Sequence, residues 1–346
     1  IQFKKLYRDQ GHKGNEGKYF IPVSKSLSLR IQRRCYNPIM TTTTPIGGVI
    51  AASITPIRSN CKPDYGAIPA YLDFLAQRGC HGALVLGTTG EGPSFSFQER
   101  KQIYRSALEI KQKYPDFLLL AGTGTPSLDE TIRLTKFVFE IGLDGVVVLP
   151  PYYFRNASQA GLLVWFNNLM DKAVPQEGRL FAYHIPQLTG IRFPIEFLAR
   201  LHDLHPTKFA GLKDSSAEEE YAKELGKRFG KDLTVFTGQD RLFGFALRNQ
   251  AAGCITAGAN LFSPWLRQVY DAHIHGIILT DLEDKIKKAR SIMDQYSPAS
   301  ALIKAVLPSL FKLPLWTVRP PILPLEKSQV QSAIQQLSYE CGITET

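Results

Sequence analysis

Cysteine is scarce in this sequence, and its spacing is irregular. The 346 residues contain five cysteines, an odd number, and no two of them form a Cys-x-x-Cys pair. This pattern argues against a disulfide framework and against a zinc site, and it favours reduced thiols in a cytoplasmic protein. The sequence also lacks any apolar run near the roughly 18 to 20 residues that cross a bilayer. We therefore expect a soluble protein with no membrane partner.

Basic charge is not spread along the chain. The net charge is +10, but residues 1–39 hold nine Lys or Arg against two acidic residues, so they carry +7 and the other 307 residues carry +3. The folded part therefore gives no reason to expect a nucleic-acid partner. Residues 1–39 also lack helical or strand periodicity, and we expect a disordered basic tail. It is either an organelle transit peptide or sequence upstream of a start at Met40, and the polar stretch after Met40 favours the second.

Eight short apolar runs alternate with longer amphipathic stretches from residue 48 onward. The runs are 49–57, 82–87, 117–121, 145–150, 179–185, 208–213, 233–238 and 252–258. The stretches with helical spacing are 68–79, 97–113, 127–141, 158–173, 194–205, 217–229, 240–249 and 263–275. Eight strand-helix units predict an α/β fold, a closed (β/α)8 TIM barrel, over residues 46–276. An open doubly wound sheet is the alternative, but its Gly-x-Gly-x-x-Gly after the first strand is missing.

Helix boundaries and the C-terminal region complete this outline. A serine three residues before a glutamate predicts a capping box at Ser96, at Ser127 and at Ser216. Residues 277–346 are assigned to a C-terminal helical extension, with helices expected at 279–297, 300–312 and 326–341. Two short histidine pairs, His202/His205 and His273/His275, are interpreted as surface histidines, and no metal is expected.

The active site of such a barrel lies at the C-terminal ends of its strands. Gly-Thr-Thr-Gly-Glu at 87–91 follows the second strand, and its backbone amides and hydroxyls suit a carboxylate, although a simple tight turn is the alternative. Lys213 ends the sixth strand, where desolvation favours the neutral, nucleophilic amine. The alternative is a lysine that reaches solvent beside Asp214.

Other strand ends carry weaker signals. Tyr183 ends the fifth strand, where a phenol can relay protons, although a buried structural tyrosine is common. Gly238 and Asp240 follow the seventh strand, and residues 258–260 follow the eighth. These segments either contact a substrate or only turn the chain.

Five motifs occur in one order along the chain. They are Gly-Thr-Thr-Gly-Glu at 87–91, Pro-Tyr-Tyr at 151–153, Tyr-x-x-Pro-x-x-Thr-Gly at 183–190, Gly-Leu-Lys-Asp-Ser at 211–215 and Thr-Gly-Gln-Asp at 237–240. In these motifs, and from about residue 46 to 310, the sequence resembles the dihydrodipicolinate synthase and N-acetylneuraminate lyase family of class I, pyruvate-dependent aldolases.

The resemblance implies roles for the candidate residues. Lys213 would form an imine with a 2-oxo acid, so that neither a metal nor an organic cofactor is needed. Tyr183 would move protons, and Thr88 and Thr89 would hold the pyruvate carboxylate and pass protons. Tyr153 would reach into a neighbouring subunit's site, which implies a homo-oligomer, a dimer of dimers. Further substrate-binding candidates are Gly87, Ser215, Gly238, Asp240 and Ile255.

Three positions depart from the family's patterns. Synthases that use aspartate semialdehyde typically read Tyr-Asn-x-Pro-x-Arg-Thr-Gly, and here His184 and Leu188 replace the asparagine and the arginine. Without that arginine, the second substrate's carboxylate loses its obvious partner. Sialic acid lyases tend to carry an acidic residue where this chain has Arg241.

These departures favour one substrate class. We expect a Schiff-base aldol lyase that joins or separates pyruvate and an aldehyde. The favoured activity is that of a 2-keto-3-deoxy sugar acid aldolase or a 4-hydroxy-2-oxoglutarate aldolase. The alternatives are a 4-hydroxy-tetrahydrodipicolinate (dihydrodipicolinate) synthase and, in another class, a catalytically silent barrel that binds a metabolite.

Overall fold

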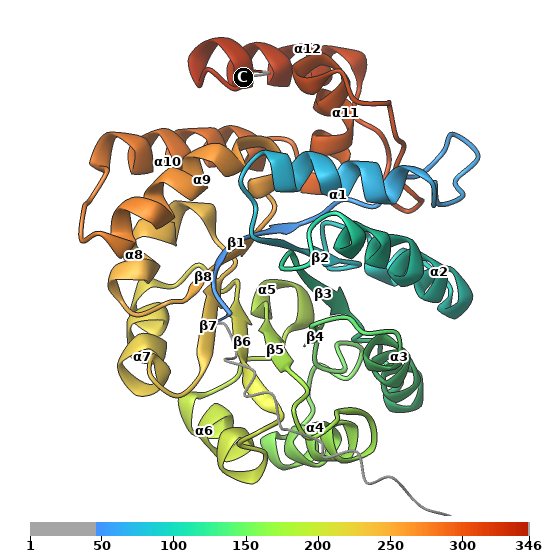
Figure 1. The fold of residues 1–346 in the computed structure, drawn as a ribbon, viewed down its shortest axis with the longest axis vertical. Helices are drawn as coiled ribbons and strands as arrows, with labels where there is room; N and C mark the ends of the chain where they lie inside the picture. Colours follow the sequence, from blue (N-terminus) through green and yellow to red (C-terminus); the bar gives the residue numbers. More distant parts are fainter. Residues whose placement is uncertain (1–45, 345–346) are drawn as a thin grey trace, which may run out of the picture. The chain divides into compact units, whose positions relative to one another are not determined.

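A computed structural model describes residues 46–344. The predicted tail, residues 1–39, lies outside the described residues. Eight parallel strands close into a barrel in chain order (Figure 1), which confirms the predicted (β/α)8 fold. The strands are β1 (Gly48–Ala52), β2 (Gly82–Val85), β3 (Leu118–Gly122), β4 (Gly145–Val148), β5 (Leu180–His184), β6 (Phe209–Asp214), β7 (Thr234–Thr237) and β8 (Gly253–Thr256).

A helix follows each strand and covers the outside of the barrel (Figure 1). These helices are α1 (Ala67–Gln77), α2 (Phe97–Leu108), α3 (Leu128–Glu140), α4 (Gln159–Ala173), α6 (Ile195–Leu204), α7 (Glu219–Phe229), α8 (Phe243–Arg248) and α9 (Ala259–Ile274). Shorter helical turns are η1 (Gly92–Ser94), η2 (Glu109–Gln112), α5 (Pro186–Thr189) and η3 (Asp240–Leu242). The C-terminal extension contains α10 (Thr280–Asp294), α11 (Ala299–Phe311), α12 (Lys327–Gln335) and the π-helical turn η4 (Gln336–Glu340).

The strands bury both of their faces, which is why their sequences read as continuous apolar runs. In β1, Ile50 and Ala52 belong to an inner cluster that fills the barrel, whereas Val49 and Ala51 pack against the surrounding helices. This alternation follows the two-residue period of a strand. It also determines which strand-end side chains point toward the barrel axis.

The helix starts agree with the sequence at two of the three predicted capping boxes. The Ser96 side chain accepts a hydrogen bond from the Glu99 amide, and the Glu99 carboxylate accepts one from the Ser96 amide. Ser127 likewise caps α3. The prediction at Ser216 is wrong, because its hydroxyl donates to the Asp214 carboxylate at 3.0 Å and α7 begins only at Glu219.

Two predicted elements are longer than the observed ones. The first strand ends at Ala52 rather than at residue 57, because the chain leaves the barrel to form an isolated antiparallel bridge between Ile57 and Pro63. The predicted helix 97–113 ends at Leu108 and tightens into the 3₁₀ turn η2. Helix α5 follows β5 and was not predicted. In the described part of the chain, no helix combines the length and apolarity that crossing a membrane requires.

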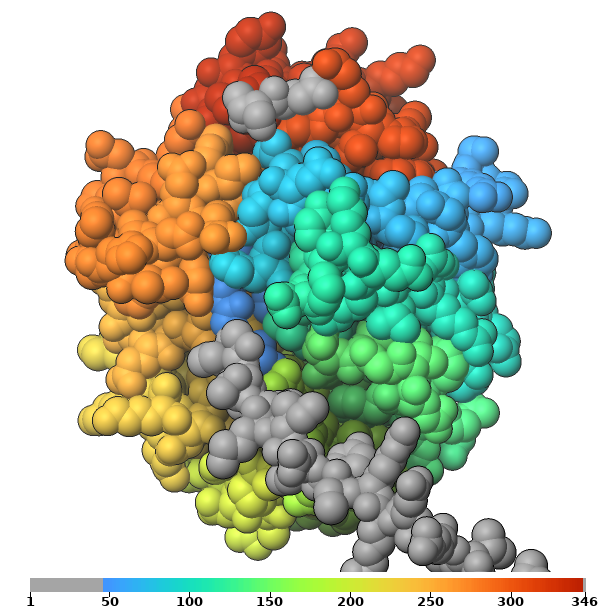
Figure 2. All heavy atoms as spheres, viewed as in Figure 1, coloured from blue at the N-terminus to red at the C-terminus, as the bar shows by residue number. Residues whose placement is uncertain are grey.

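The C-terminal extension packs against α1 through aromatic side chains. The ring of Trp316 meets Tyr71 edge to face at 5.5 Å, and Phe311 lies 5.3 Å from Phe74. In Figures 1 and 2, the red C-terminal segments lie directly beside the blue α1. Such rings contribute large buried apolar areas, so the extension is fixed to the barrel rather than loosely attached.

Candidate active site

Tyr183 and Lys213 are paired across neighbouring strands. Residues in register on parallel strands point to the same face, and Tyr183 belongs to the inner cluster of the barrel. Both side chains are therefore directed inward at the C-terminal ends of β5 and β6, and both residues are buried. The ammonium nitrogen of Lys213 lies 4.1 Å from the centroid of the Tyr183 ring. The structure thus brings together the two side chains that matter most in the sequence prediction.

The environment of the Tyr183 phenol changes its acidity. Burial raises the pKa of Tyr183, whereas the positive charge of Lys213 lowers it. Hydrogen bonds that Thr88 and Ser215 make with the phenol lower the pKa further, and the net result lies below the ordinary value of 10.0. A phenol with a lowered pKa gives up and takes back its proton more readily near neutral pH, which suits a proton shuttle.

The loop after β2 contributes the third member of this group. The Thr88 hydroxyl lies 3.3 Å from the Tyr183 hydroxyl. The amide of Gly92 donates to the Gly87 carbonyl at 3.1 Å and closes the loop. Thr88 is exposed at the barrel mouth, whereas Thr89 is buried. The loop therefore presents one hydroxyl toward the tyrosine and the solvent-facing mouth.

Ser215 and Gly238 support the end of β6 from the other side. Ser215 is buried, and its amide donates to the His184 carbonyl at 2.8 Å. Gly238 packs closely on Ser215, because a Cβ there would lie 1.9 Å from the Ser215 hydroxyl oxygen and would displace that side chain. Gln187, on α5, donates to the Ser215 carbonyl at 2.6 Å. These contacts fix the segment that carries the lysine.

Two predicted substrate-binding residues have other contacts. The buried carboxylate of Asp240 accepts a hydrogen bond from Arg290 of α10 at 2.8 Å. Its neighbour Arg241 pairs with Asp294, also on α10. Ile255 is fully buried within the inner cluster. The Asp240 carboxylate is therefore engaged with the C-terminal extension.

Tyr153 lies in the loop after β4 and is 76 % exposed. Its ring meets the ring of Phe154, which is also exposed, edge to face at 5.3 Å. Leu188 is exposed on α5, and nearby the stem of Arg155 covers Gly190, where a Cβ would lie 3.0 Å from the Arg155 Cδ. The predicted role of Tyr153 in a neighbouring subunit therefore stays a prediction, and its exposure is compatible with it.

One buried pair near the site was not predicted. His184 Nδ1 lies 2.8 Å from a carboxylate oxygen of Asp214, and both side chains are buried. The imidazole packs against the rings of Phe193 and Tyr221, and its Nε2 has no hydrogen-bond partner among the described residues. In the sequence, His184 stands out only as a departure from the family's asparagine. A polar residue beside Tyr183 in an apolar strand was the available signal.

A second unpredicted pair joins the loop after β2 to the C-terminal extension. Lys304 of α11 donates to the Glu91 carboxylate at 2.5 Å, and both side chains are almost completely buried. Lys304 is a single lysine within the apolar run 301–307, and such a residue requires a buried partner.

The arrangement as a whole defines a chemical class. A lysine amine, a phenol of lowered pKa and a threonine hydroxyl meet at the C-terminal end of a closed (β/α)8 barrel. This end is where enzymes of this fold carry out their chemistry, and an amine beside a proton shuttle can attack a carbonyl group. Among residues 46–344, no three His, Cys, Asp or Glu side chains are grouped to hold a metal ion.

Comparison with known proteins assigns the chain to a family. The model of the dihydrodipicolinate synthetase family matches residues 45–339, and the chain belongs to this family of aldolases and lyases. An uncharacterized DapA-like lyase of Chloroflexus aurantiacus is 38% identical over 294 residues, which are 85% of this chain and 96% of the relative. A 4-hydroxy-tetrahydrodipicolinate synthase of Prochlorococcus marinus is 29% identical over 292 residues, or 81% and 90% of the two chains.

Solved structures show the same fold. The prophage protein YagE of E. coli K12, a member of the dihydrodipicolinic acid synthase family solved with pyruvate, has a TM-score of 0.81 at 23% identity and covers 87% of this chain and 100% of its own. Dihydrodipicolinate synthase of Cyanidioschyzon merolae, solved with lysine bound, has a TM-score of 0.79 at 24% identity. The match covers 86% of this chain and 98% of that synthase. At these identities the likeness concerns the fold.

Proposed function

We propose that the chain is a class I aldolase in which Lys213 forms an imine with pyruvate or a related 2-oxo acid. The observation that carries the proposal is the position of the Lys213 nitrogen, 4.1 Å from the centroid of the Tyr183 ring. The Thr88 hydroxyl is hydrogen-bonded to the same phenol. The YagE structure was solved with pyruvate, which supports the choice of 2-oxo acid. The Thr88 and Thr89 hydroxyls would hold the carboxylate. The electron sink is then the lysine imine itself, with no other cofactor.

In the cleavage direction, the Lys213 amine adds to the carbonyl of a 4-hydroxy-2-oxo acid, and water leaves as the imine forms. Tyr183 carries the protons in this step. A base then removes the proton of the 4-hydroxyl group, the C3–C4 bond breaks, and the aldehyde departs while the electron pair moves into the imine to give an enamine. Protonation at C3 and addition of water release pyruvate and restore the amine.

The proposed substrate class is a 2-keto-3-deoxy sugar acid or 4-hydroxy-2-oxoglutarate. It rests on Leu188, an exposed apolar side chain where the family's synthases carry an arginine. A 4-hydroxy-tetrahydrodipicolinate synthase is the second candidate, because the relative from Prochlorococcus marinus bears that name. In that case the guanidinium of Arg155, an exposed residue whose stem lies beside α5, would supply the charge that Leu188 lacks.

We also propose that the protein works as a homo-oligomer. Tyr153 and Phe154 place two large aromatic rings on the surface of one loop, 76 % and 65 % exposed. Exposed aromatic side chains of this size are typical of protein interfaces.

Borohydride trapping tests the covalent step. Treatment with borohydride and pyruvate should add one reduced pyruvyl group, located on the peptide that contains Lys213. Lactate, which has no ketone, is the control ligand and should leave the mass unchanged. The variant Lys213→Arg should take up no pyruvyl group. An unmodified Lys213 in the natural sequence would falsify the mechanism, and adduct formation without turnover of any aldehyde in a panel would identify a silent binding barrel.

A further inference from the structure

Lys304, on α11 of the C-terminal extension, is a second buried lysine, and it takes no part in the proposed chemistry. Its side chain is 1 % exposed and that of Glu91 is 0 % exposed, so the ion pair between them is screened from water. The Lys304 ammonium also donates to the Thr317 carbonyl at 2.8 Å. Removing two charges from water carries a large desolvation penalty, so such a pair is weak support for stability and calls for another explanation.

Glu91 receives both of its carboxylate contacts from the C-terminal extension. One oxygen accepts from Lys304, and the other accepts from the Arg319 amide at 2.9 Å. Glu91 also adopts a φ of 56°, in the left-handed region that a residue with a side chain seldom enters. The extension therefore holds the last residue of the Gly-Thr-Thr-Gly-Glu loop in an otherwise unfavourable conformation.

Short contacts run from this pair to the proposed catalytic group. The Glu91 amide donates to the Thr88 carbonyl at 3.1 Å, within the tight turn of the loop. The Thr88 hydroxyl lies 3.3 Å from the Tyr183 phenol, whose ring lies below the Lys213 ammonium. A displacement of Glu91 would therefore move Thr88 relative to both catalytic side chains.

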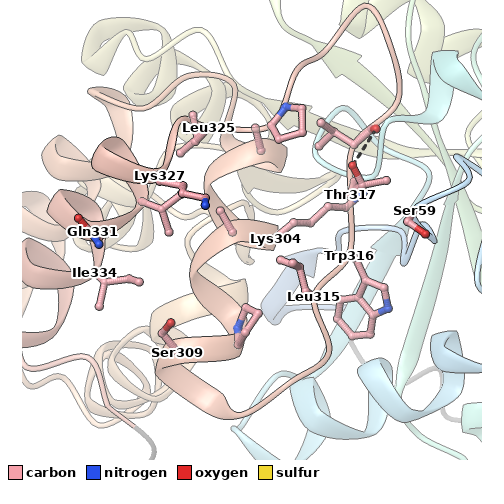
Figure 3. A pocket seen from close by; sticks show the side chains of 16 residues that line it. Ser59, Lys304, Ser309, Leu315, Trp316, Thr317, Leu325, Lys327, Gln331 and Ile334 are labelled. Atoms are coloured by element: carbon pink, nitrogen blue, oxygen red, sulfur yellow. Dashed lines mark hydrogen bonds between the residues drawn. The ribbon is translucent and has the colours of Figure 1, made fainter.

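Lys304 reaches Glu91 from the wall of a cavity. Figure 3 shows Lys304 on α11 extending toward the strand-like segment of Leu315, Trp316 and Thr317, with residues of α12 on the other side. The cavity has a volume of about 690 Å³ and is lined mostly by apolar side chains. Burial lowers the pKa of Lys304 to about 8, although the Glu91 carboxylate opposes this shift.

We propose that Lys304 and Glu91 are positioning residues, which hold the loop after β2 so that Thr88 and Thr89 can bind the carboxylate of the 2-oxo acid. This inference rests on the proposed function and deepens it, because it makes the C-terminal extension a structural part of the substrate site. Neither residue touches the substrate. Their effect is on recognition of the carboxylate rather than on the reactivity of the Lys213 amine.

The test compares two ketones, pyruvate, which carries a carboxylate, and acetone, which has a methyl group in its place. The rate of borohydride-dependent labelling of Lys213 is measured with pyruvate and with acetone, and the ratio of the two rates reports how well the loop binds the carboxylate. In Lys304→Met this ratio should fall by about tenfold, since a shift of about 1 Å in a positioning group is enough for such a loss. The matched control Ala305→Met places the same side chain in the same cavity without touching Glu91, and its ratio should stay within about twofold of the natural protein.

A neutral double variant keeps the test usable where the single variant does not fold. Glu91→Gln combined with Lys304→Met leaves no unpaired buried charge, removes the charged tether and should show the same fall in the ratio. Equal losses with pyruvate and acetone would mean a merely structural role and would overturn the inference alone. Absence of any pyruvyl adduct on Lys213 in the natural protein would overturn the proposed function and the inference together.

Discussion

Tyr183 and Lys213 lie side by side as register partners on β5 and β6, with the Lys213 nitrogen 4.1 Å from the centre of the Tyr183 ring. Because the pairing is part of the barrel's hydrogen-bonded ladder, the phenol stays beside the amine as long as the barrel is folded. The contact is also electrostatic, since a cation over an aromatic face is stabilised by about 0.5 to 2 kcal/mol. The geometry predicts that the phenol acts on the same carbonyl group as the amine.

Replacing the phenol should therefore slow the chemistry while leaving the fold intact. In Tyr183→Phe, the ring and its packing remain, but the hydroxyl that carries protons to and from the Lys213 adduct is lost. We expect kcat to fall by about a hundredfold or more, the usual contribution of a general acid or base. Steady-state kinetics with a cleaved 4-hydroxy-2-oxo acid, together with circular dichroism, provide the measurement.

Tyr104 offers a matched control for this variant. Its ring is fully buried on α2, and its hydroxyl donates to the Gly122 carbonyl at 2.8 Å. Tyr104→Phe removes one buried hydrogen bond, so the free energy of unfolding should fall by about 1 kcal/mol while kcat stays unchanged. Equal kinetic losses in the two variants would show that Tyr183 contributes only to packing.

The sequence was sufficient to predict the closed barrel and the positions of the strand ends. Lys213 and Tyr183 each end an apolar run, and a parallel barrel brings all such ends to one side. Their direct pairing was not predictable, because the ladder between β5 and β6 shifts its register between Leu180 and Phe181. A shift of one residue alternates the face to which a side chain points, and no local pattern specifies it.

Contacts between distant segments account for the rest of what the sequence did not reveal. Glu91 and Lys304 are far apart in the chain, and nothing near either residue indicates its partner. Ser216 is a different case, because its sequence fits a capping box but its hydroxyl instead donates to the nearby Asp214 carboxylate. A contact between distant segments decided the first case, whereas a competing hydrogen bond to a residue two positions away decided the second.

The Thr88 hydroxyl should contribute to the upper pH limit of the reaction. Burial raises the pKa of Tyr183, but the charge of Lys213 and then the hydrogen bond from Thr88 lower it below 10.0. If the protonated phenol is the form that donates to the adduct, the rate falls as pH rises through this pKa. Thr88→Val removes the hydrogen bond, so the phenolate is less stable, the pKa rises and the alkaline fall moves to higher pH.

A pH profile of kcat for Thr88→Val beside the natural protein measures this shift. At neutral pH we also expect a loss of about two- to tenfold, which corresponds to one hydrogen bond of about 0.5 to 1.5 kcal/mol. Thr88→Ser keeps the hydroxyl and should keep the natural profile. A profile that moves to lower pH, or that does not move in Thr88→Val, contradicts the assigned role of the hydroxyl.

Leu188 provides the sharpest test of substrate class. Its side chain is 56 % exposed on α5, in the position where the family's synthases carry an arginine for the second substrate's carboxylate. A lost charge-assisted hydrogen bond costs about 1.5 to 3 kcal/mol. Without the arginine, kcat/KM for aspartate semialdehyde should therefore be about ten- to a hundredfold lower than with it. Leu188→Arg should restore much of this loss and impair cleavage of the sugar acid.

The measurement is the ratio of kcat/KM for aspartate semialdehyde to that for a neutral hydroxylated aldehyde, with pyruvate saturating. In the natural protein the ratio should lie below one, Leu188→Arg should raise it by about tenfold or more, and Leu188→Met, which keeps the apolar surface, should leave it unchanged. Arg155→Met belongs in the same series, because the Arg155 stem lies over Gly190 beside α5 and its guanidinium is a candidate for a replacement charge. If the natural protein prefers the semialdehyde by more than about tenfold, it is a synthase. A fall in that preference in Arg155→Met would then identify Arg155 as the residue that replaces the missing arginine.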